Sequence, residues 1–243
     1  MHLILIGAHP DDETLASGTI TKYVDRGHRA TIVHATRGGK GHWEIPTDEL
    51  KKIRTREMTK AAEILGADVM FLDYEDASVP QEDVLREAVV NVYRKLKPDV
   101  VLTFHPLVSR DDHRRVGEAA SDASLKASLP LHVTDLPAHR PEPDLYFFGT
   151  PMSGQETDMY IDITDYMDVK IESFRHHISQ WQEWGKSPDD QGDFLGRLVE
   201  RYTHRFRELG RKAGVGYAEA FISKSGRKYP HDLLPLNKFP VRV

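Results

Sequence analysis

The sequence predicts an α/β protein built on a mostly parallel β-sheet. Short apolar runs alternate with longer amphipathic stretches over the first two thirds of the 243 residues. Pro98 stands just before one of the apolar runs, where a helix has to end. Strands that alternate with helices form βαβ units with right-handed crossovers, and such units build a parallel sheet.

The spacing of apolar residues places the elements in order. The helix at 49–65 illustrates the pattern, because apolar residues recur there near the helical period and Gly66 supplies a C-terminal stop. Strands are predicted at 2–7, 30–34, 69–72, 100–104 and 145–149, with a weaker sixth at 159–163. Helices are predicted at 14–26, 49–65, 81–96, 114–127, 165–182 and 191–209.

Three segments depart from this alternation. Residues 37–48 are rich in glycine and polar groups and are predicted to form a loop. Residues 128–144 hold four prolines and are predicted to be an irregular insertion. The tail at 223–243 is basic and punctuated by prolines, and we expect it to wrap the surface. The whole chain, 1–243, is interpreted as a single domain.

Composition excludes several classes of protein. The formal net charge of -5 argues against a general nucleic-acid binder. Cysteine is absent, so any metal must be bound by His, Asp, Glu or water. No apolar stretch approaches the length of a membrane span, and the first residues lead directly into a strand rather than a signal peptide. A cytoplasmic protein is therefore expected.

Residues 8–13 gather one imidazole and three carboxylates in a single strand-to-helix turn. The cluster consists of His9, Asp11, Asp12 and Glu13. Like charges this close repel one another unless a cation or solvent compensates them. A helix cap accounts for one acid at a helix N-terminus, but two acids and a histidine exceed what a cap needs. The cluster therefore indicates a divalent-metal hydrolase.

Three residues are predicted to hold the metal. His9 and Asp12 are three residues apart and can face one point across the turn. His113 follows the strand at 100–104, and in a parallel sheet both loops leave at carboxyl ends of strands. Two His and one Asp suit Zn²⁺ and also tolerate Fe²⁺, Co²⁺ or Mn²⁺. His105, at the end of that strand, competes with His113 for the ligand role.

The adjacent acid supplies a base for the chemistry. A metal acidifies a bound water and makes it a nucleophile near neutral pH. Asp11 adjoins Asp12 but is expected to point in a different direction, which makes Asp11 the predicted general base.

The motifs resemble the PIG-L/LmbE-like family of zinc-dependent de-N-acetylases. Ala-His-Pro-Asp-Asp-Glu after an amino-terminal strand, with a later Asp-His-Arg, is the most specific likeness. Other similarities follow in the family's order along most of the chain: the glycine loop 36–41, Arg54 with Glu57, the His-x-Ser-Gln element at 177–180, and Tyr-Ala-Glu-x-Phe at 217–221.

The resemblance implies a Rossmann-like fold, with helices on both faces of the sheet, and hydrolysis of an N-acetyl or related N-acyl group from an amino-sugar conjugate. It assigns zinc to His9, Asp12 and His113, and the general base to Asp11. Arg54 matches an arginine that contacts substrate, and Tyr217 matches a residue at the rim of the active site.

One position departs from the family. The family commonly has His-Pro-Asp-His at the second motif, whereas residues 110–113 are Arg-Asp-Asp-His. Arg110 can stabilise an oxyanion but is a poor proton donor. Protonation of the leaving amine is then expected to fall to Asp11 or to His105. Asp112 keeps the family's acid and is predicted to orient a histidine.

Several interpretations stay open at this point. Arg54 and Glu57 could form only a surface ion pair, which we weigh evenly with a functional role. Glu219 lies in an apolar, strand-like stretch and needs a partner, either Arg54 or a ligand histidine. The aromatic late helix leaves room for a homo-oligomer interface. The rival function is a non-catalytic metal- or sugar-binding protein on the same scaffold, distinguished from an enzyme by turnover assays.

Overall fold

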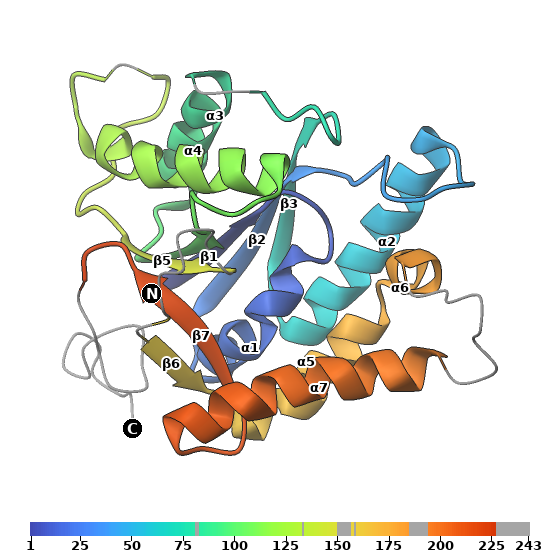
Figure 1. Cartoon of the computed structure of the whole chain (residues 1–243). Coiled ribbons are helices and arrows are strands. Elements are labelled where there is room, and N and C mark those ends of the chain that lie inside the picture. Colours follow the sequence, from blue (N-terminus) through green and yellow to red (C-terminus); the bar gives the residue numbers. More distant parts are fainter. Residues whose placement is uncertain (81–82, 133, 150–156, 158, 185–193, 227–243) are drawn as a thin grey trace.

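A computed structural model describes the chain except for residues 81–82, 133, 150–156, 158, 185–193 and 227–243. Seven strands form one sheet in the order β3-β2-β1-β4-β5-β7-β6 (Figure 1). The first five of these pair in parallel, and β7 pairs antiparallel with both β5 and β6. The fold is thus α/β with a mostly parallel sheet, as the alternating pattern predicts.

The elements have the following bounds. The strands are β1 His2–Gly7, β2 Arg29–Thr36, β3 Asp68–Tyr74, β4 Val100–Phe104, β5 Asp144–Phe148, β6 Met159–Asp162 and β7 Ala218–Ser223. The helices are α1 Ser17–Asp25, α2 Thr47–Leu65, α3 Asp83–Leu96, α4 Asp111–Ser128, α5 Met167–Arg175, α6 Ile178–Trp184 and α7 Phe194–Ala213. Two short 3-10 helices, η1 Asp12–Leu15 and η2 Thr164–Tyr166, precede α1 and α5.

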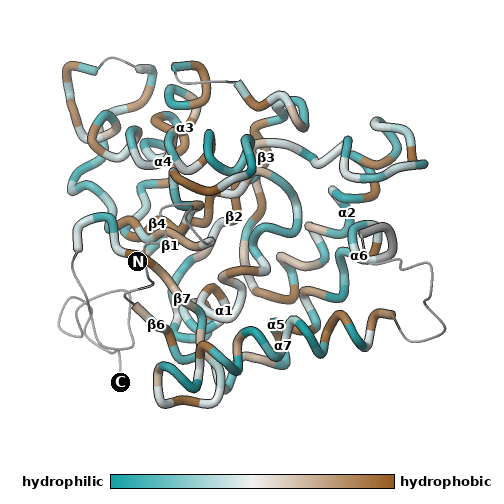
Figure 2. The backbone as a smooth tube through the Cα atoms, viewed as in Figure 1, coloured by the Kyte–Doolittle hydropathy of each residue, from teal (hydrophilic) through white to brown (hydrophobic). Residues whose placement is uncertain are grey.

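Strand β1 lies in the middle of the protein and contributes side chains to two hydrophobic cores. Leu3 and Leu5 pack on the face covered by α1, α2 and α5, whereas Ile4 and Ile6 pack on the face covered by α3 and α4. Side chains of a strand alternate between faces, so a run of consecutive apolar residues is what a doubly covered strand requires. Figure 2 shows hydrophobic residues along β1 and β4 at the centre, while α7 alternates hydrophobic and hydrophilic segments.

The sequence placed the first helix and the late helix imperfectly. The stretch at 14–26 begins as the 3-10 turn η1, and the α-helix starts only at Ser17. The helix predicted over 165–182 is interrupted at His176 and His177 and continues as α6. His177 is fully buried, and its side chain turns inward to Glu13. Periodicity within one segment does not report such a long-range polar contact.

The remaining segments differ in how far the structure describes them. Between α4 and β5 the described residues form neither helix nor strand, as expected for the proline-rich stretch. The predicted tail lies outside the described residues beyond 226. Within the described part of the chain, no helix is long and apolar enough to cross a membrane.

The sheet order fixes where a site can form. Strand β1 pairs with β2 on one side and with β4 on the other, so the chain reverses its direction of winding between β1 and β4. In doubly wound sheets the loops at the carboxyl ends of such a strand pair diverge and leave a crevice that binds ligands. The turn after β1 and the segment between β4 and α4 both lead to this edge.

Candidate active site

The turn after β1 is folded back on itself by Asp12. Its Oδ2 accepts hydrogen bonds from the backbone N–H groups of Ala8, at 2.7 Å, and His9, at 2.8 Å. The turn also requires a glycine at the strand end, because a Cβ on Gly7 would lie 2.9 Å from the Asp12 Cβ. Asp12 is therefore held by the main chain, with its second oxygen available for another contact.

His9, Asp12 and His113 converge on one point. The Nδ1 atom of His9 lies 3.2 Å from Nε2 of His113, and that Nε2 lies 3.3 Å from Oδ1 of Asp12. The ring of His113 is fixed by stacking on Phe104, with the centroids 4.0 Å apart. The three candidate ligand atoms all lie within 4.8 Å of one another.

This geometry fits a divalent cation. With metal–ligand bonds of about 2.0–2.1 Å, adjacent ligands of a tetrahedral site stand roughly 3.3 Å apart. The two short separations match that value, and a set of two imidazoles and one carboxylate is a known donor set for catalytic metals. The cluster can therefore hold a metal while leaving a coordination position open.

The other side of His9 faces two carboxylates. Its Nε2 lies 3.1 Å from Oδ1 of Asp76 and 3.2 Å from Oδ2 of Asp112. Burial alone would lower the pKa of His9, but the hydrogen bonds to Asp112 and Asp76 override it and raise the pKa to about 10. An Nε2–H held by carboxylates leaves Nδ1 as the nitrogen that faces Asp12 and His113, as in metal-bound histidines.

The two acids behind His9 are themselves anchored. Asp76 Oδ2 accepts the N–H of Lys40 at 2.7 Å, and Asp112 Oδ2 accepts the N–H of Ala77 at 2.9 Å. Despite its burial, Asp76 has its pKa lowered to about 2, mainly by the hydrogen bond with His9. Together with His9 these acids form a second group of potential ligands. Their anchoring and their position behind Nε2 suit the orientation of His9.

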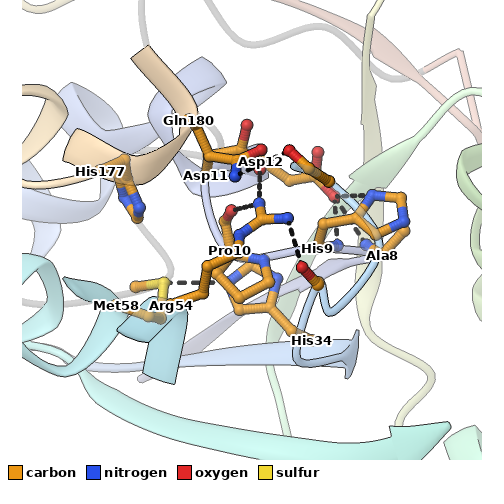
Figure 3. Close-up of polar contacts among 12 residues, drawn as sticks. Ala8, His9, Pro10, Asp11, Asp12, His34, Arg54, Met58, His177 and Gln180 are labelled. Carbon is orange, nitrogen blue, oxygen red and sulfur yellow. Dashed lines mark hydrogen bonds and ion pairs between the residues drawn. The ribbon is translucent and has the colours of Figure 1, made fainter. Parts of the chain in front are cut away.

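Asp11 sits in an unusual conformation beside the cluster. Its φ angle is 118°, in a region that residues other than glycine rarely adopt. Arg54, which is 2% exposed, donates to Asp11 Oδ1 at 2.9 Å and also to the carbonyl of Pro10 (Figure 3). Burial raises the pKa of Asp11, and the Arg54 guanidinium opposes that rise only in part. A carboxylate with a raised pKa in a pocket suits proton transfer.

These groups open into one pocket of about 690 Å³. Its lining joins the turn after β1, the loop after β2, helix α2, the residues after β3, the start of α4 and helix α6. The lining residues are His9, Asp11, Asp12, Lys40, Gly41, Arg54, Asp76, Ala77, Arg110, Asp111, Asp112, His113, Gln180 and Trp181.

Most residues singled out in the sequence lie at this pocket. Arg54 is not a partner of Glu57, whose carboxylate accepts two hydrogen bonds from Ser179 instead. Arg110 occupies the N-cap position of α4 without a side-chain capping bond, is exposed and lines the pocket. His105 is buried against Phe147 and accepts the N–H of Leu107, and it does not line the pocket.

Tyr217 and Glu219 are placed away from the pocket. The hydroxyl of Tyr217 accepts a hydrogen bond from Arg207 at 3.0 Å. Glu219 is paired with Lys170, whose Nζ lies 2.6 Å from Oε1, and it accepts the N–H groups of Gly18 and Thr19. The expected partners, Arg54 or a ligand histidine, are thus replaced by a buried lysine and the start of α1.

Four residues at or beside the pocket were not assigned to the site from the sequence. Asp76 comes two residues after β3 ends, so the argument used for His9 and His113 could have found it. Gln180 and Trp181 enter the pocket from α6. Gln180 belongs to the His-x-Ser-Gln element at 177–180, and Trp181 to the aromatic late helix that was expected to offer an interface rather than a pocket wall. The sequence places Glu13 in the acidic cluster without a role of its own, whereas its carboxylate is fully buried and bonded to His177.

Comparison with known proteins agrees with this geometry. Residues 4–124 match the family model described as PIG-L, GlcNAc-PI de-N-acetylase. A diacetylchitobiose deacetylase from Thermococcus kodakarensis is 32% identical over 226 residues, which cover 89% of this chain and 80% of the relative. A 1D-myo-inositol 2-acetamido-2-deoxy-alpha-D-glucopyranoside deacetylase from Geodermatophilus obscurus is 33% identical, but the match covers only 55% of this chain and 56% of that protein.

Solved structures share the architecture over nearly the whole chain. The N,N'-diacetylchitobiose deacetylase of Pyrococcus horikoshii superposes with a TM-score of 0.79 at 28% identity, covering 93% of this chain and 84% of that one. A 4-carboxy-2-hydroxymuconate hydratase from Pseudomonas putida has a TM-score of 0.75 at 24% identity, covering 92% of this chain and 95% of that one. Because a hydratase has the same fold, the fold alone does not decide the reaction.

Proposed function

Because the chain belongs to the PIG-L/LmbE-like family of de-N-acetylases, we propose that it is a metal-dependent hydrolase that removes an N-acetyl or related N-acyl group from an amino-sugar conjugate. The observation that carries the proposal is the convergence of His9, Asp12 and His113 beside Asp11 in one open pocket. Two relatives that are 32% and 33% identical carry the names of deacetylases of N-acetylated amino sugars. This supports an enzyme over a non-catalytic binding protein.

His9, Asp12 and His113 are proposed to bind the metal. When the four metals are offered at equal concentration, this donor set is expected to bind Zn²⁺ more tightly than Fe²⁺, Co²⁺ or Mn²⁺. When bound, such an ion supplies Lewis-acid chemistry, which acidifies a water molecule and polarises a carbonyl. Asp76 and Asp112 hold the Nε2–H of His9, so the imidazole presents Nδ1 toward the ion.

Asp11 is proposed as the general base. Its Oδ1 is fixed by Arg54, and its raised pKa makes it a better proton acceptor than an exposed aspartate. In this role it takes a proton from the attacking water. It is also the best placed donor for the leaving amine, because His105 does not line the pocket. In this assignment Arg54 holds Asp11 in place rather than binding substrate directly.

Arg110 is proposed to stabilise the oxyanion that forms on the acyl carbonyl. Its side chain is exposed at the start of α4 and belongs to the pocket lining next to the ligand His113. A permanently charged guanidinium can donate to an oxyanion without needing to be protonated first. This assignment leaves proton transfer to Asp11 alone, which is the main difference from a site with histidine at that position.

The function is tested by turnover with defined metal content. The protein is stripped with a chelator, reloaded separately with Zn²⁺, Fe²⁺, Co²⁺ or Mn²⁺, and assayed for free amine and acetate. The panel contains N-acetylglucosamine, diacetylchitobiose and an N-acetylglucosaminyl-inositol conjugate, with the non-acetylated sugars as controls. We expect activity that disappears on stripping and returns with metal. Absence of turnover on every N-acetylated sugar in all four loaded forms would overturn the proposal.

A further inference from the structure

Asp11 has both of its neighbouring peptide groups held by hydrogen bonds. In the peptide group before Asp11, the carbonyl oxygen belongs to Pro10 and accepts a hydrogen bond from Arg54. The N–H of the same peptide group is that of Asp11, and it donates to Oε2 of Glu13 at 3.0 Å. The peptide after it is bound through the Asp11 carbonyl, which accepts the N–H of Thr14 at 3.1 Å. Since φ is the rotation about the N–Cα bond between these groups, the contacts fix the φ of 118°.

Glu13 is an unusual hydrogen-bond acceptor for the N–H of Asp11. Its side chain is completely buried, and a buried carboxylate is retained only where partners compensate the loss of water. Its Oε1 lies 2.5 Å from Nε2 of His177, and its Oε2 lies 3.5 Å from Nε2 of His34. Glu13 therefore joins the turn after β1 to the residue just before α6, His177, and to β2 at a single carboxylate.

A purely structural role would be to attach α6 to the domain. That attachment has a second, separate component: Glu57 on α2 accepts the N–H of Ser179 at 2.8 Å and its hydroxyl at 2.7 Å. Glu57 does not touch the turn after β1, whereas Glu13 contacts the N–H of Asp11 directly. The two acids thus share the α6 contact but differ in the contact with Asp11.

We propose that Glu13 is a positioning residue for the general base, holding Asp11 at its positive φ, with His177 and His34 fixing the Glu13 carboxylate. The inference rests on the proposed function for its kinetic consequences. A group that must accept a proton from a defined point loses its effect when it is displaced by even an ångström, at a cost of roughly 100-fold in rate. Removal of Glu13 should therefore lower kcat more than it raises KM.

Three variants test this directly. In Glu13→Ala the N–H of Asp11 loses its acceptor, and we expect kcat to fall by roughly 10- to 100-fold. In Glu13→Gln the amide oxygen can still accept that N–H, and kcat should stay within roughly threefold of wild type. Glu57→Ala is the matched control, because it loosens α6 without touching Asp11; it should raise KM through Gln180 while leaving kcat within about twofold.

Two further measurements keep the outcomes distinct. Metal content by mass spectrometry must equal that of wild type in all three variants, since none removes a ligand. Crystal structures report the φ of Asp11, which should stay positive in Glu13→Gln and in Glu57→Ala and change in Glu13→Ala. Equal kcat losses for Glu13→Ala and Glu57→Ala, or an unchanged Asp11 φ in Glu13→Ala, would overturn the proposal.

If Glu13→Ala fails to fold, Glu13→Gln carries the kinetic test, since a large fall in its kcat with an intact Asp11 φ contradicts the positioning role. Failure of the proposed function has a different signature. Wild-type protein would then show no turnover on the acetylated sugars, while the φ of Asp11 across the variants would still decide whether Glu13 holds this residue.

Discussion

The two ends of strand β1 carry histidines whose surroundings shift their pKa values in opposite directions. His2, at the amino end, is buried, and burial lowers its pKa although its Nδ1 donates to the carbonyl of Leu96 at 2.7 Å. His9, just past the carboxyl end, is also buried, but Asp112 and Asp76 override burial and raise its pKa to about 10.

The difference lies in what the neighbouring segments bring to each edge of the sheet. At the amino end His2 meets a carbonyl and the hydroxyl of Thr31, both neutral, so the neutral imidazole is favoured. At the carboxyl end His9 meets carboxylates on both nitrogens, so the site favours positive charge. A proton or a metal can supply that charge, which supports the carboxyl edge as the proposed site of the chemistry.

Substitution of the two histidines should produce the largest contrast. His9→Ala removes a proposed metal ligand, and we expect loss of bound metal and a fall in kcat/KM of at least roughly a thousandfold. His2→Ala, at the other end of the same strand, should cost stability but leave metal content and kcat/KM within about threefold. Metal analysis and steady-state kinetics on the two purified variants measure both quantities. A His2→Ala variant that also loses its metal would contradict the separation of the two edges.

Asp11→Asn separates the role of the proposed base from that of the proposed metal ligands at the carboxyl edge. The substitution removes the proposed base without removing a ligand, so kcat should fall by roughly 100- to 10,000-fold while metal affinity changes little. Titration with Zn²⁺ and single-turnover kinetics separate the two effects. Activity close to that of wild type would show that another group accepts the proton of water.

Arg110 is expected to have a smaller effect, because it is exposed and, in the proposed mechanism, would share oxyanion stabilisation with the metal. Arg110→Ala should lower kcat by roughly 10- to 100-fold, less than the loss of a buried oxyanion donor. Arg110→His restores the residue common in the family and adds a proton donor, so its kcat should exceed that of Arg110→Ala. Equal kcat values for the two variants and wild type would remove Arg110 from the chemistry.

Site residues at the carboxyl edge of the sheet could be predicted where they share one turn or follow a strand of the parallel sheet. His9, Asp11 and Asp12 share one turn, and His113 follows a strand whose partner could be inferred, so their convergence was predictable. The five parallel strands were equally accessible, since each is a short apolar run. All of these features depend on spacing within a few residues or on the general rule for parallel sheets.

Other features depend on contacts that spacing does not encode. Glu13 and His177 are separated by 164 residues and meet only because the break between α5 and α6 lies against the turn after β1. Strand β7 is inserted antiparallel between β5 and β6, so it packs out of chain order. Glu219 was expected to pair with Arg54 or a ligand histidine, yet its partner is Lys170 on α5.

The smallest predicted effect concerns stability at the amino end of β1. Because the pKa of folded His2 lies below the unfolded value of about 6.5, the unfolded chain binds more protons at mildly acidic pH. The contribution of His2 to stability is therefore fully present above about pH 6.5 and is lost as the pH falls through the folded pKa. His2→Gln removes this titration, so Tm should decrease less in the variant than in wild type between about pH 7.5 and about pH 5. Calorimetry on both proteins in the metal-free form measures the difference, because competition between protons and metal at His9 is then absent from the comparison. Identical pH dependence in the two proteins would mean that the buried imidazole of His2 is not a source of acid sensitivity, and the contrast between the two ends of the strand would then rest on His9 alone.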